Sequence, residues 1–181
     1  CIDAEHVSIF MAVPALLQFM LDAPEREQCD LTSLRWIATG AAPAPVSLLN
    51  RWSDLGVSIH QAYGLTESCG PGTLLLPSDA IAKVGSCGRP QMHTEAKIVD
   101  AKGETIPPGS ADAGELLLSG PHMMKEYWNK PEATAETLQD GWLHTGDICT
   151  WDEEGFITIC DRKKDMIISG GENIYPAELE N

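Results

Sequence analysis

The segment Gln61–Glu67 gathers the side chains of this sequence that are best suited to chemistry. Tyr63 offers an aromatic face for a purine, and Gly64 would let the backbone approach a ligand closely. Thr66 offers a hydroxyl donor, and Glu67 offers the hard oxygen ligand that Mg²⁺ prefers. The segment follows an expected strand, and ligands bind beyond the carboxyl ends of strands in open parallel sheets. Taken alone, its simplest interpretation is a strand-to-loop turn with a surface carboxylate.

A second candidate stretch, Gly40–Pro45, consists of small residues and prolines and follows another expected strand. Its small side chains leave room for a flat ligand or an acyl chain, although an ordinary strand-to-helix loop has the same composition. Parallel strands end at the same edge of a sheet, so this stretch and Gln61–Glu67 could form one cleft.

Two charged residues further along could bind a sugar. Asp147 ends the segment Gly141–Asp147, and its carboxylate can accept two hydrogen bonds from a vicinal diol such as ribose. Arg162, in the charge run Asp161–Asp165, could hold an anion or a ribose hydroxyl. Each has a simpler interpretation, as a solvated aspartate at a hairpin turn and as a solvated linker or interdomain hinge.

The composition restricts the class of protein. The 181 residues include 12 Lys+Arg and 27 Asp+Glu, which gives a net charge of −15, and 43% of the residues are hydrophobic. This balance is typical of a globular protein and argues against non-specific nucleic-acid binding, which needs a basic surface. No apolar run approaches the roughly 20 residues that cross a bilayer. No signal peptide is visible, so we expect a cytoplasmic protein, with any membrane contact peripheral.

The six cysteines contain no CxxC pair. A zinc site or a disulfide framework would show closer grouping. We therefore expect buried thiols.

The pattern of residues 1–80 predicts an α/β subdomain. Strands are expected at Val7–Met11, Leu34–Thr39 and Val57–His60, with helices that begin near Pro14 and Pro45. Strands that alternate with helices predict a parallel sheet that is buried on both faces. The apolar face of the second helix would consist of Val46, Leu48, Leu49, Trp52 and Leu55, with Gly56 as its end.

Residues 81–160 predict a small antiparallel β-barrel or sandwich, so the fold class is α/β plus β. The expected strands are Ala96–Val99, Glu115–Ser119, Asp147–Trp151 and Phe156–Cys160, and one helix is expected at Pro131–Leu138. Residues 161–165 would be a hinge, and residues 166–181 would begin a truncated C-terminal domain with a strand at Met166–Ser169 and a helix from Pro176. Since the chain starts at Cys1 and stops early in that helix, we expect a fragment.

Four segments in this order resemble the adenylate-forming superfamily of acyl-CoA synthetases, aryl-CoA ligases, beetle luciferases and nonribosomal peptide adenylation domains. They are Thr39–Pro43, Tyr63–Glu67, Gly141–Asp147 and Asp161–Glu180. The resemblance covers the whole chain, and Ala62–Cys69 with Glu126–Pro131 looks most like bacterial fatty-acyl-CoA synthetases. It implies a ligase that converts ATP and a carboxylate to an acyl-adenylate and then to a CoA thioester.

The resemblance also implies residue roles. Thr66 and Glu67 would be catalytic, with Thr66 on the phosphate and Glu67 holding Mg²⁺. Nucleotide-binding residues would be Gly40, Ala41, Ala42, Pro43, Gln61, Tyr63, Gly64, Thr66, Asp147 and Arg162. The acyl pocket would use Ala41, Ala62 and Gly64. Lys164 would lie at the hinge, and Gly170 and Gly171 would line the CoA tunnel.

Three hypotheses about the function remain open. The family's Ser/Thr/Gly-rich loop that ends in lysine and its C-terminal catalytic lysine have no counterpart in these residues, so we expect a fatty acid–CoA ligase fragment that is inactive by itself. The alternative is a non-catalytic module that binds nucleotide or a partner chain, including a homodimer through exposed sheet edges. A third is an aryl-CoA ligase or other adenylating enzyme, because small residues suit an aromatic ring as well as a slim acyl chain.

Overall fold

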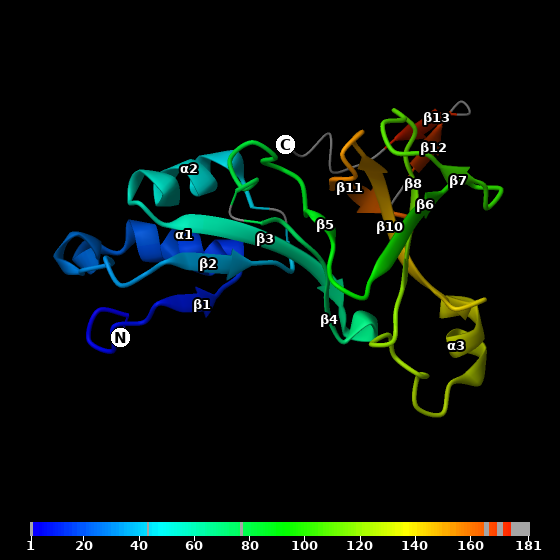
Figure 1. The fold of residues 1–181 in the computed structure, drawn as a ribbon, viewed down its shortest axis with the longest axis horizontal. Helices are drawn as coiled ribbons and strands as arrows, with labels where there is room; N and C mark the ends of the chain where they lie inside the picture. Colours follow the sequence, from blue (N-terminus) through cyan, green and yellow to red (C-terminus); the bar gives the residue numbers. More distant parts are fainter. Residues whose placement is uncertain (1, 43, 77, 165–166, 170–171, 175–181) are drawn as a thin grey trace. The chain divides into compact units, whose positions relative to one another are not determined.

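Two compact units make up the chain in the computed structural model, which describes residues 2–42, 44–76, 78–164, 167–169 and 172–174 (Figure 1). The first unit consists of Cys1–Tyr63 and Leu74–Gly88, and the second of Gly64–Thr73 and Arg89–Asn181. A parallel α/β arrangement in the first and an antiparallel sheet in the second confirm the predicted fold class.

The first unit alternates strands and helices as predicted. Its elements are β1 (Ile9–Met11), α1 (Pro14–Asp22), η1 (Pro24–Gln28), β2 (Trp36–Thr39), α2 (Val46–Asp54) and the start of β3 (Ser58–Leu65). β1, β2 and β3 are neighbours and pair in parallel, with Ile9 opposite Trp36 and Trp36 opposite Ser58. Pro14 at the start of α1 costs no hydrogen bond, because the first turn of a helix has no acceptor for its N–H.

One face of this parallel sheet carries the core. Leu17 of α1 and Leu48 and Trp52 of α2 pack in one buried cluster with Ile37 of β2 and Ile59 of β3. Right-handed crossovers between consecutive neighbouring strands place both helices on the same face of a sheet.

The prediction that both faces are buried is therefore wrong. Ile9 and Met11 of β1 are 42% and 66% exposed, and β2 alternates between buried and half-buried residues. A sheet covered by helices on a single face shows this alternation.

The apolar face of α2 is narrower than its sequence indicates. Leu48, Leu49 and Trp52 are buried, but Val46 and Leu55 are 52% and 41% exposed. These two residues lie at the first position and the C-cap of the helix. Gly56 ends the helix with φ of 78°, as predicted.

β3 is longer than predicted, which changes the setting of the candidate site. The strand was expected to end at His60 but continues to Leu65, so the residues from Gln61 to Leu65 lie in a strand and not in a loop. Two unpredicted strands follow in the same sheet, β4 (Gly70–Leu74) and β5 (Arg89–Pro90). Glycine and proline are depleted in strands, which is why the Gly-Pro-Gly start of β4 gave no strand signal.

An antiparallel sheet with strand order β11-β10-β8-β6-β7 forms the core of the second unit. Its strands are β6 (Glu95–Val99), β7 (Thr105–Ile106), β8 (Gly114–Ser119), β9 (Leu138–Gln139, paired with β10), β10 (Trp142–Trp151) and β11 (Ile157–Arg162). The four predicted strands and the helix α3 (Pro131–Thr137) are confirmed, although β10 begins earlier, at Trp142, and β11 runs on to Arg162. The predicted hairpin turn is confirmed too: the Asp152 carboxylate accepts the N–H groups of Glu154 and Phe156, both at 2.9 Å.

A short antiparallel pair ends the described residues. β12 (Ile167–Ser169) matches the predicted strand, and β13 (Glu172–Ile174) was not predicted. Met166 and the helix expected from Pro176 lie outside the described residues.

The burial of the cysteines agrees only in part with the expectation from sequence. Among the described cysteines, Cys87 and Cys149 are buried as expected, but Cys29 and Cys69 are exposed, since they lie in surface turns.

No helix in the described part of the chain is long and apolar enough to cross a membrane.

Candidate functional site

The loop after β2 carries the first predicted nucleotide-binding residues. A Cβ on Gly40 would lie 2.8 Å from the carbonyl oxygen of Ala62, so glycine lets this loop pass close to β3. Ala41 has φ of 69°, a left-handed conformation that a non-glycine residue adopts at an energetic cost. Backbone strain of this kind is enriched at binding sites. Ala41 and Ala42 are exposed, and Pro43 lies outside the described residues.

Gln61 supports this loop from β3. Its side-chain oxygen accepts the N–H of Ala44 at 3.1 Å, and its side-chain nitrogen donates to the carbonyl of Ser86 at 3.3 Å. The residue is 7% exposed. Gln61 therefore acts on the predicted site by holding the end of the Gly40–Ala44 loop.

The adjoining residues of β3 differ in exposure. Ala62 is half-buried, and Tyr63 is buried, with 8% of its surface exposed. A Cβ on Gly64 would collide with the carbonyl oxygen of Gly70 and lie 2.8 Å from Cα of Pro71. The backbone that approaches Gly64 closely is thus that of the following strand of this chain.

Thr66 and Glu67 lie in a short 3-10 turn, η2 (Thr66–Ser68), directly after β3. The buried Ser68 hydroxyl accepts the N–H of Leu65 at 2.9 Å and lies 2.6 Å from the carbonyl oxygen of Gly70. These bonds tie the two ends of the turn together. Thr66 is exposed and Glu67 is half-buried, so the turn presents a hydroxyl and a carboxylate at the surface of the second unit.

Tyr127 holds the Glu67 side chain. Its phenol donates to Oε1 of Glu67 at 2.7 Å, and the Met124 N–H donates to the Glu67 carbonyl at 2.7 Å. The hydrogen bond to the Glu67 carboxylate, together with burial, raises the pKa of Tyr127, because the phenol must keep its proton to donate this bond. The carboxylate of Glu67 is thereby fixed by a segment sixty residues away.

Asp147 and Arg162 form the second charged pair. Nε of Arg162 lies 2.7 Å from Oδ1 of Asp147, whose side chain is 3% exposed, and the two residues are directly opposite in the β10–β11 pairing. Burial of a carboxylate is tolerated when a cation partners it. The structure thus brings together the two residues that were expected to bind the ribose.

Glu115 of β8 lies beside this pair. Its Oε2 accepts from Nζ of Lys163 at 2.8 Å and lies 3.4 Å from Nδ1 of His144, while Oε1 accepts the Gly146 N–H at 3.2 Å. Burial raises the pKa of this carboxyl, but the hydrogen bond and charge of Lys163, with His144, outweigh it, so the pKa of Glu115 is lowered overall.

A lowered pKa predicts a loss of stability in acid. The folded protein holds the proton of Glu115 less tightly than the unfolded chain does. This carboxylate therefore stabilises the fold above the ordinary glutamate pKa of about 4.3, and the contribution disappears as the pH falls through the folded value. We expect Glu115→Gln to lower the free energy of unfolding by about 1–2 kcal/mol at pH 7 and by less at pH 3.

Urea denaturation at both pH values measures this difference. Glu95→Gln, an exposed glutamate of β6 in the same sheet, is the control. A cost of Glu115→Gln that is as large at pH 3 as at pH 7 would contradict the prediction.

Three further residues were predicted, at the hinge and along the CoA path. Lys164 is exposed in the turn after β11. Gly170 and Gly171 lie outside the described residues.

The side chains present fit a magnesium ion that is bound together with phosphate. Mg²⁺ is usually held through one or two carboxylates plus substrate phosphates, and Glu67 offers one carboxylate in a fixed orientation. Among the described residues, no group of three or more His, Cys, Asp or Glu side chains could hold a metal ion by itself. A metal at Glu67 would therefore depend on the phosphate oxygens of a nucleotide.

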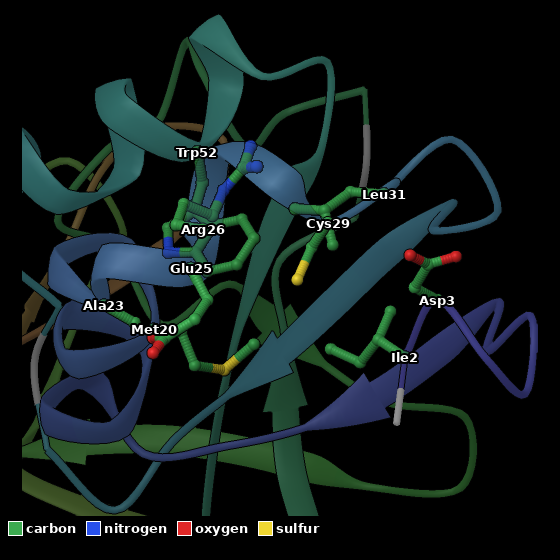
Figure 2. Close-up of a pocket in the computed structure, with 9 residues that line it drawn as sticks. All are labelled: Ile2, Asp3, Met20, Ala23, Glu25, Arg26, Cys29, Leu31 and Trp52. Carbon is green, nitrogen blue, oxygen red and sulfur yellow. The ribbon is translucent and has the colours of Figure 1, made fainter.

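A pocket of about 260 Å³ in the first unit involves other residues (Figure 2). Nε of Arg26 and Nε1 of Trp52 are buried there without a hydrogen-bond partner among the described residues. None of the predicted site residues lines this pocket. Its lining consists of Ile2, Asp3, Met20, Ala23, Glu25, Arg26, Cys29, Leu31 and Trp52.

Sequence reasoning assigned no role to several residues that organise the site: Ser68, Glu115, Tyr127 and Lys163. Ser68 follows a pattern that local sequence could have shown, since serine commonly caps short turns. The partners of Glu115 and Tyr127 are distant in sequence, so no local signal points to them.

Curated proteins similar to this chain include CoA ligases. The chain is 46% identical to a feruloyl-CoA synthase of Amycolatopsis sp over 181 residues, which cover 99% of this chain and 36% of that protein. It is also 46% identical to the long-chain-fatty-acid–CoA ligase FadD13 of Mycobacterium tuberculosis, with coverage of 98% and 35%. The chain thus spans about a third of the length of these relatives.

Solved structures agree over nearly the whole chain. The o-succinylbenzoate CoA synthetase MenE of Bacillus subtilis, in complex with ATP and magnesium ion, matches with a TM-score of 0.89 and 40% identity and covers 99% of this chain and 36% of that one. A fatty acyl CoA synthetase of Mycobacterium tuberculosis matches with a TM-score of 0.85 and 46% identity, covering 99% and 35%. The sequence pattern of the AMP-binding enzyme family matches residues 1–128. Because the family pattern covers most of the chain and the similar solved structures have the adenylate-forming fold, the chain belongs to the AMP-binding enzyme family.

Proposed function

We propose that this chain carries nucleotide-binding and acid-binding parts of an acid–CoA ligase. The observation that supports this most strongly is that the second unit holds two carboxylates, each oriented by its own partner. Glu67 is held by Tyr127 and Asp147 by Arg162. The first suits a metal-bound phosphate and the second suits a ribose diol.

The proposed reaction has two steps. A carboxylate oxygen of the acid attacks the α-phosphorus of ATP, the bond to the β-phosphate breaks, and pyrophosphate leaves. The sulfur of CoA then attacks the acyl carbon, and AMP leaves with the electrons of the acyl–oxygen bond. Adenylation is needed because a free carboxylate is a poor electrophile.

The residues of this chain would bind and orient the nucleotide. Asp147 and Arg162 take the ribose hydroxyls, Thr66 donates to the phosphate, and Tyr63 with the Gly40–Ala42 loop takes the adenine. Mg²⁺ held by Glu67 would neutralise charge on the phosphate under attack. Lys164 serves as the hinge, and Gly170 with Gly171 lines the path of CoA.

A fatty acid is our first candidate for the acid, with Ala41, Ala62 and Gly64 beside the acyl chain. An aryl acid is the second candidate, because the feruloyl-CoA synthase is as similar to this chain as the fatty-acid ligase is, at 46% identity.

Isothermal titration of the purified chain with AMP tests the proposal. We expect saturable binding that Asp147→Ala removes, and no pyrophosphate release with ATP and palmitate or ferulate. A chain that does not bind AMP contradicts nucleotide binding. Pyrophosphate release above that of Glu67→Ala contradicts the expected inactivity. A dimer in size-exclusion chromatography with no AMP binding would favour the non-catalytic module.

Tyr127→Phe is expected to raise the Mg²⁺ concentration that half-saturates ATP binding by about 10-fold, because an unrestrained Glu67 must be ordered when the metal binds. AMP binding without metal should be unchanged. The measurement is a Mg²⁺ titration of ATP binding by calorimetry.

The control for this prediction is Trp128→Phe, which changes the neighbouring aromatic side chain, 84% exposed. The same Mg²⁺ dependence in Tyr127→Phe and in the unmodified chain would show that the hydrogen bond does not orient Glu67 for the metal.

A further inference from the structure

Glu115 bonds to two separate segments of the second unit, and its side chain is 10% exposed. One carboxylate oxygen accepts a backbone N–H of β10, and the other accepts from Lys163, which follows β11. A buried carboxylate with several partners is costly to displace, since each lost bond leaves a charge unsatisfied. Its position therefore constrains both strands that meet at Asp147 and Arg162.

The bond to β10 lies in a bulge. His144 is opposite Leu117 and Ile148 is opposite Glu115, so Thr145, Gly146 and Asp147 together face the single residue Leu116. Bulges re-aim side chains and interrupt the hydrogen bonds of a sheet.

Two contacts compensate for the interrupted hydrogen bonds. The Gly146 N–H donates to Glu115, and the Asp147 N–H donates to the Thr145 hydroxyl at 3.1 Å. Glu115 thus provides the hydrogen-bond acceptor for the backbone N–H of Gly146, the residue directly before Asp147.

The bond to Lys163 acts on the other member of the pair. Lys163 directly follows Arg162, its backbone N–H donates to the Gly146 carbonyl at 2.8 Å, and its ammonium donates to Glu115 at 2.8 Å. Gly146 is therefore held from both sides, with its N–H on Glu115 and its carbonyl on Lys163. The carboxylate of Glu115 therefore connects Gly146, which precedes Asp147, with Lys163, which follows Arg162.

We propose that Glu115 is a positioning residue for nucleotide binding, which holds the β10 bulge and Lys163 so that Asp147 and Arg162 meet the ribose hydroxyls in one fixed geometry. This inference rests on the proposed function. Glu115 touches no nucleotide itself. It acts through the two residues that do.

A purely structural role predicts a different result. If Glu115 only stabilised the fold, its loss would weaken the binding of every adenine nucleotide by the same factor. If Glu115 positions the pair, its loss lowers the affinity for nucleotides that carry ribose hydroxyls and leaves the affinity for nucleotides without them unchanged. The ratio of the two affinities separates these roles.

The experiment measures binding of AMP and of 2′,3′-dideoxyadenosine monophosphate to the full chain by calorimetry. We expect Glu115→Gln to reduce the preference for AMP by about 10-fold. Lys163→Ala, which changes a side chain that is 59% exposed, should reduce it in the same direction without unfolding the chain. Glu95→Gln is the control and should leave the preference within about 2-fold of the unmodified chain. An unchanged preference in both Glu115→Gln and Lys163→Ala overturns the proposal.

Amide hydrogen exchange provides a second test that needs no nucleotide. In Glu115→Ala, the N–H groups of Gly146 and Asp147 should exchange at least about 10-fold faster, while those of β6 keep their rates. Unchanged exchange at Gly146 overturns the proposal whether or not the chain binds AMP. Absence of AMP binding by the unmodified chain, with fast exchange in the variant, would contradict the proposed function and leave the positioning of the bulge supported.

Discussion

Replacement of Asp147 by alanine is expected to weaken AMP binding by about 100-fold or more. Hydrogen bonds to a charged group contribute about 1.5–3 kcal/mol each, and the proposed ribose contact uses two. The Arg162 guanidinium would also lose the carboxylate 2.7 Å from it. Calorimetry with AMP measures the effect, and thermal denaturation measures whether the variant folds.

Two further variants make this result interpretable. Asp147→Asn keeps the shape of a residue that is 2% exposed and should lose most of the same affinity, because the charge that pairs with Arg162 is gone. Asp140→Asn is the matched control, since Asp140 is exposed just before β10 and has φ of 51°, which asparagine adopts readily. AMP affinity within about 3-fold of the unmodified chain in folded Asp147→Ala would remove Asp147 from the binding site.

Gly64→Ala is expected to destabilise the chain by about 3 kcal/mol, because its Cβ would collide with the backbone of Gly70, which side-chain motion cannot relieve. Gly103→Ala is the control. Gly103 has φ of 83° with open space around it, so alanine there costs only backbone strain of about 1 kcal/mol. Urea denaturation of the two variants gives the comparison.

The outcome decides between two reasons for a glycine at position 64. A large loss of stability supports the close approach of β4. Unaltered stability with lost nucleotide binding would instead support the expectation that the glycine makes room for a ligand. Gly40, whose Cβ would lie 2.8 Å from the Ala62 carbonyl, shows the same kind of close approach in the first unit.

Elements with a strong local signal were predicted well. α1 and α3 begin with Pro14 and Pro131, α2 begins directly after Pro45, and Gly56 follows the C-cap of α2. The Asp152–Gly155 turn was recognised by its residues and joins β10 to β11. In each case the determining interactions lie within a few residues of chain, which is the range over which sequence patterns carry information.

Elements without a local signal were missed. β4 begins with Gly-Pro-Gly and exists because β3 and β5 lie beside it. β3 continues through Gly64 for the same reason, since pairing partners extend a strand beyond its apolar run. The uncovered face of the parallel sheet depends on both crossovers having the same hand, and no residue pattern in β1 or β2 indicates this.

Residue type and order are enough to identify Tyr63–Glu67, Asp147 and Arg162 as candidates for a nucleotide site. How these groups are held depends on contacts between segments that are distant in the chain. Tyr127 is sixty residues from Glu67, and Lys163 is forty-eight residues from Glu115. Such contacts form because strand pairing brings distant segments together. Their energies depend on distance and burial, which a linear pattern does not contain.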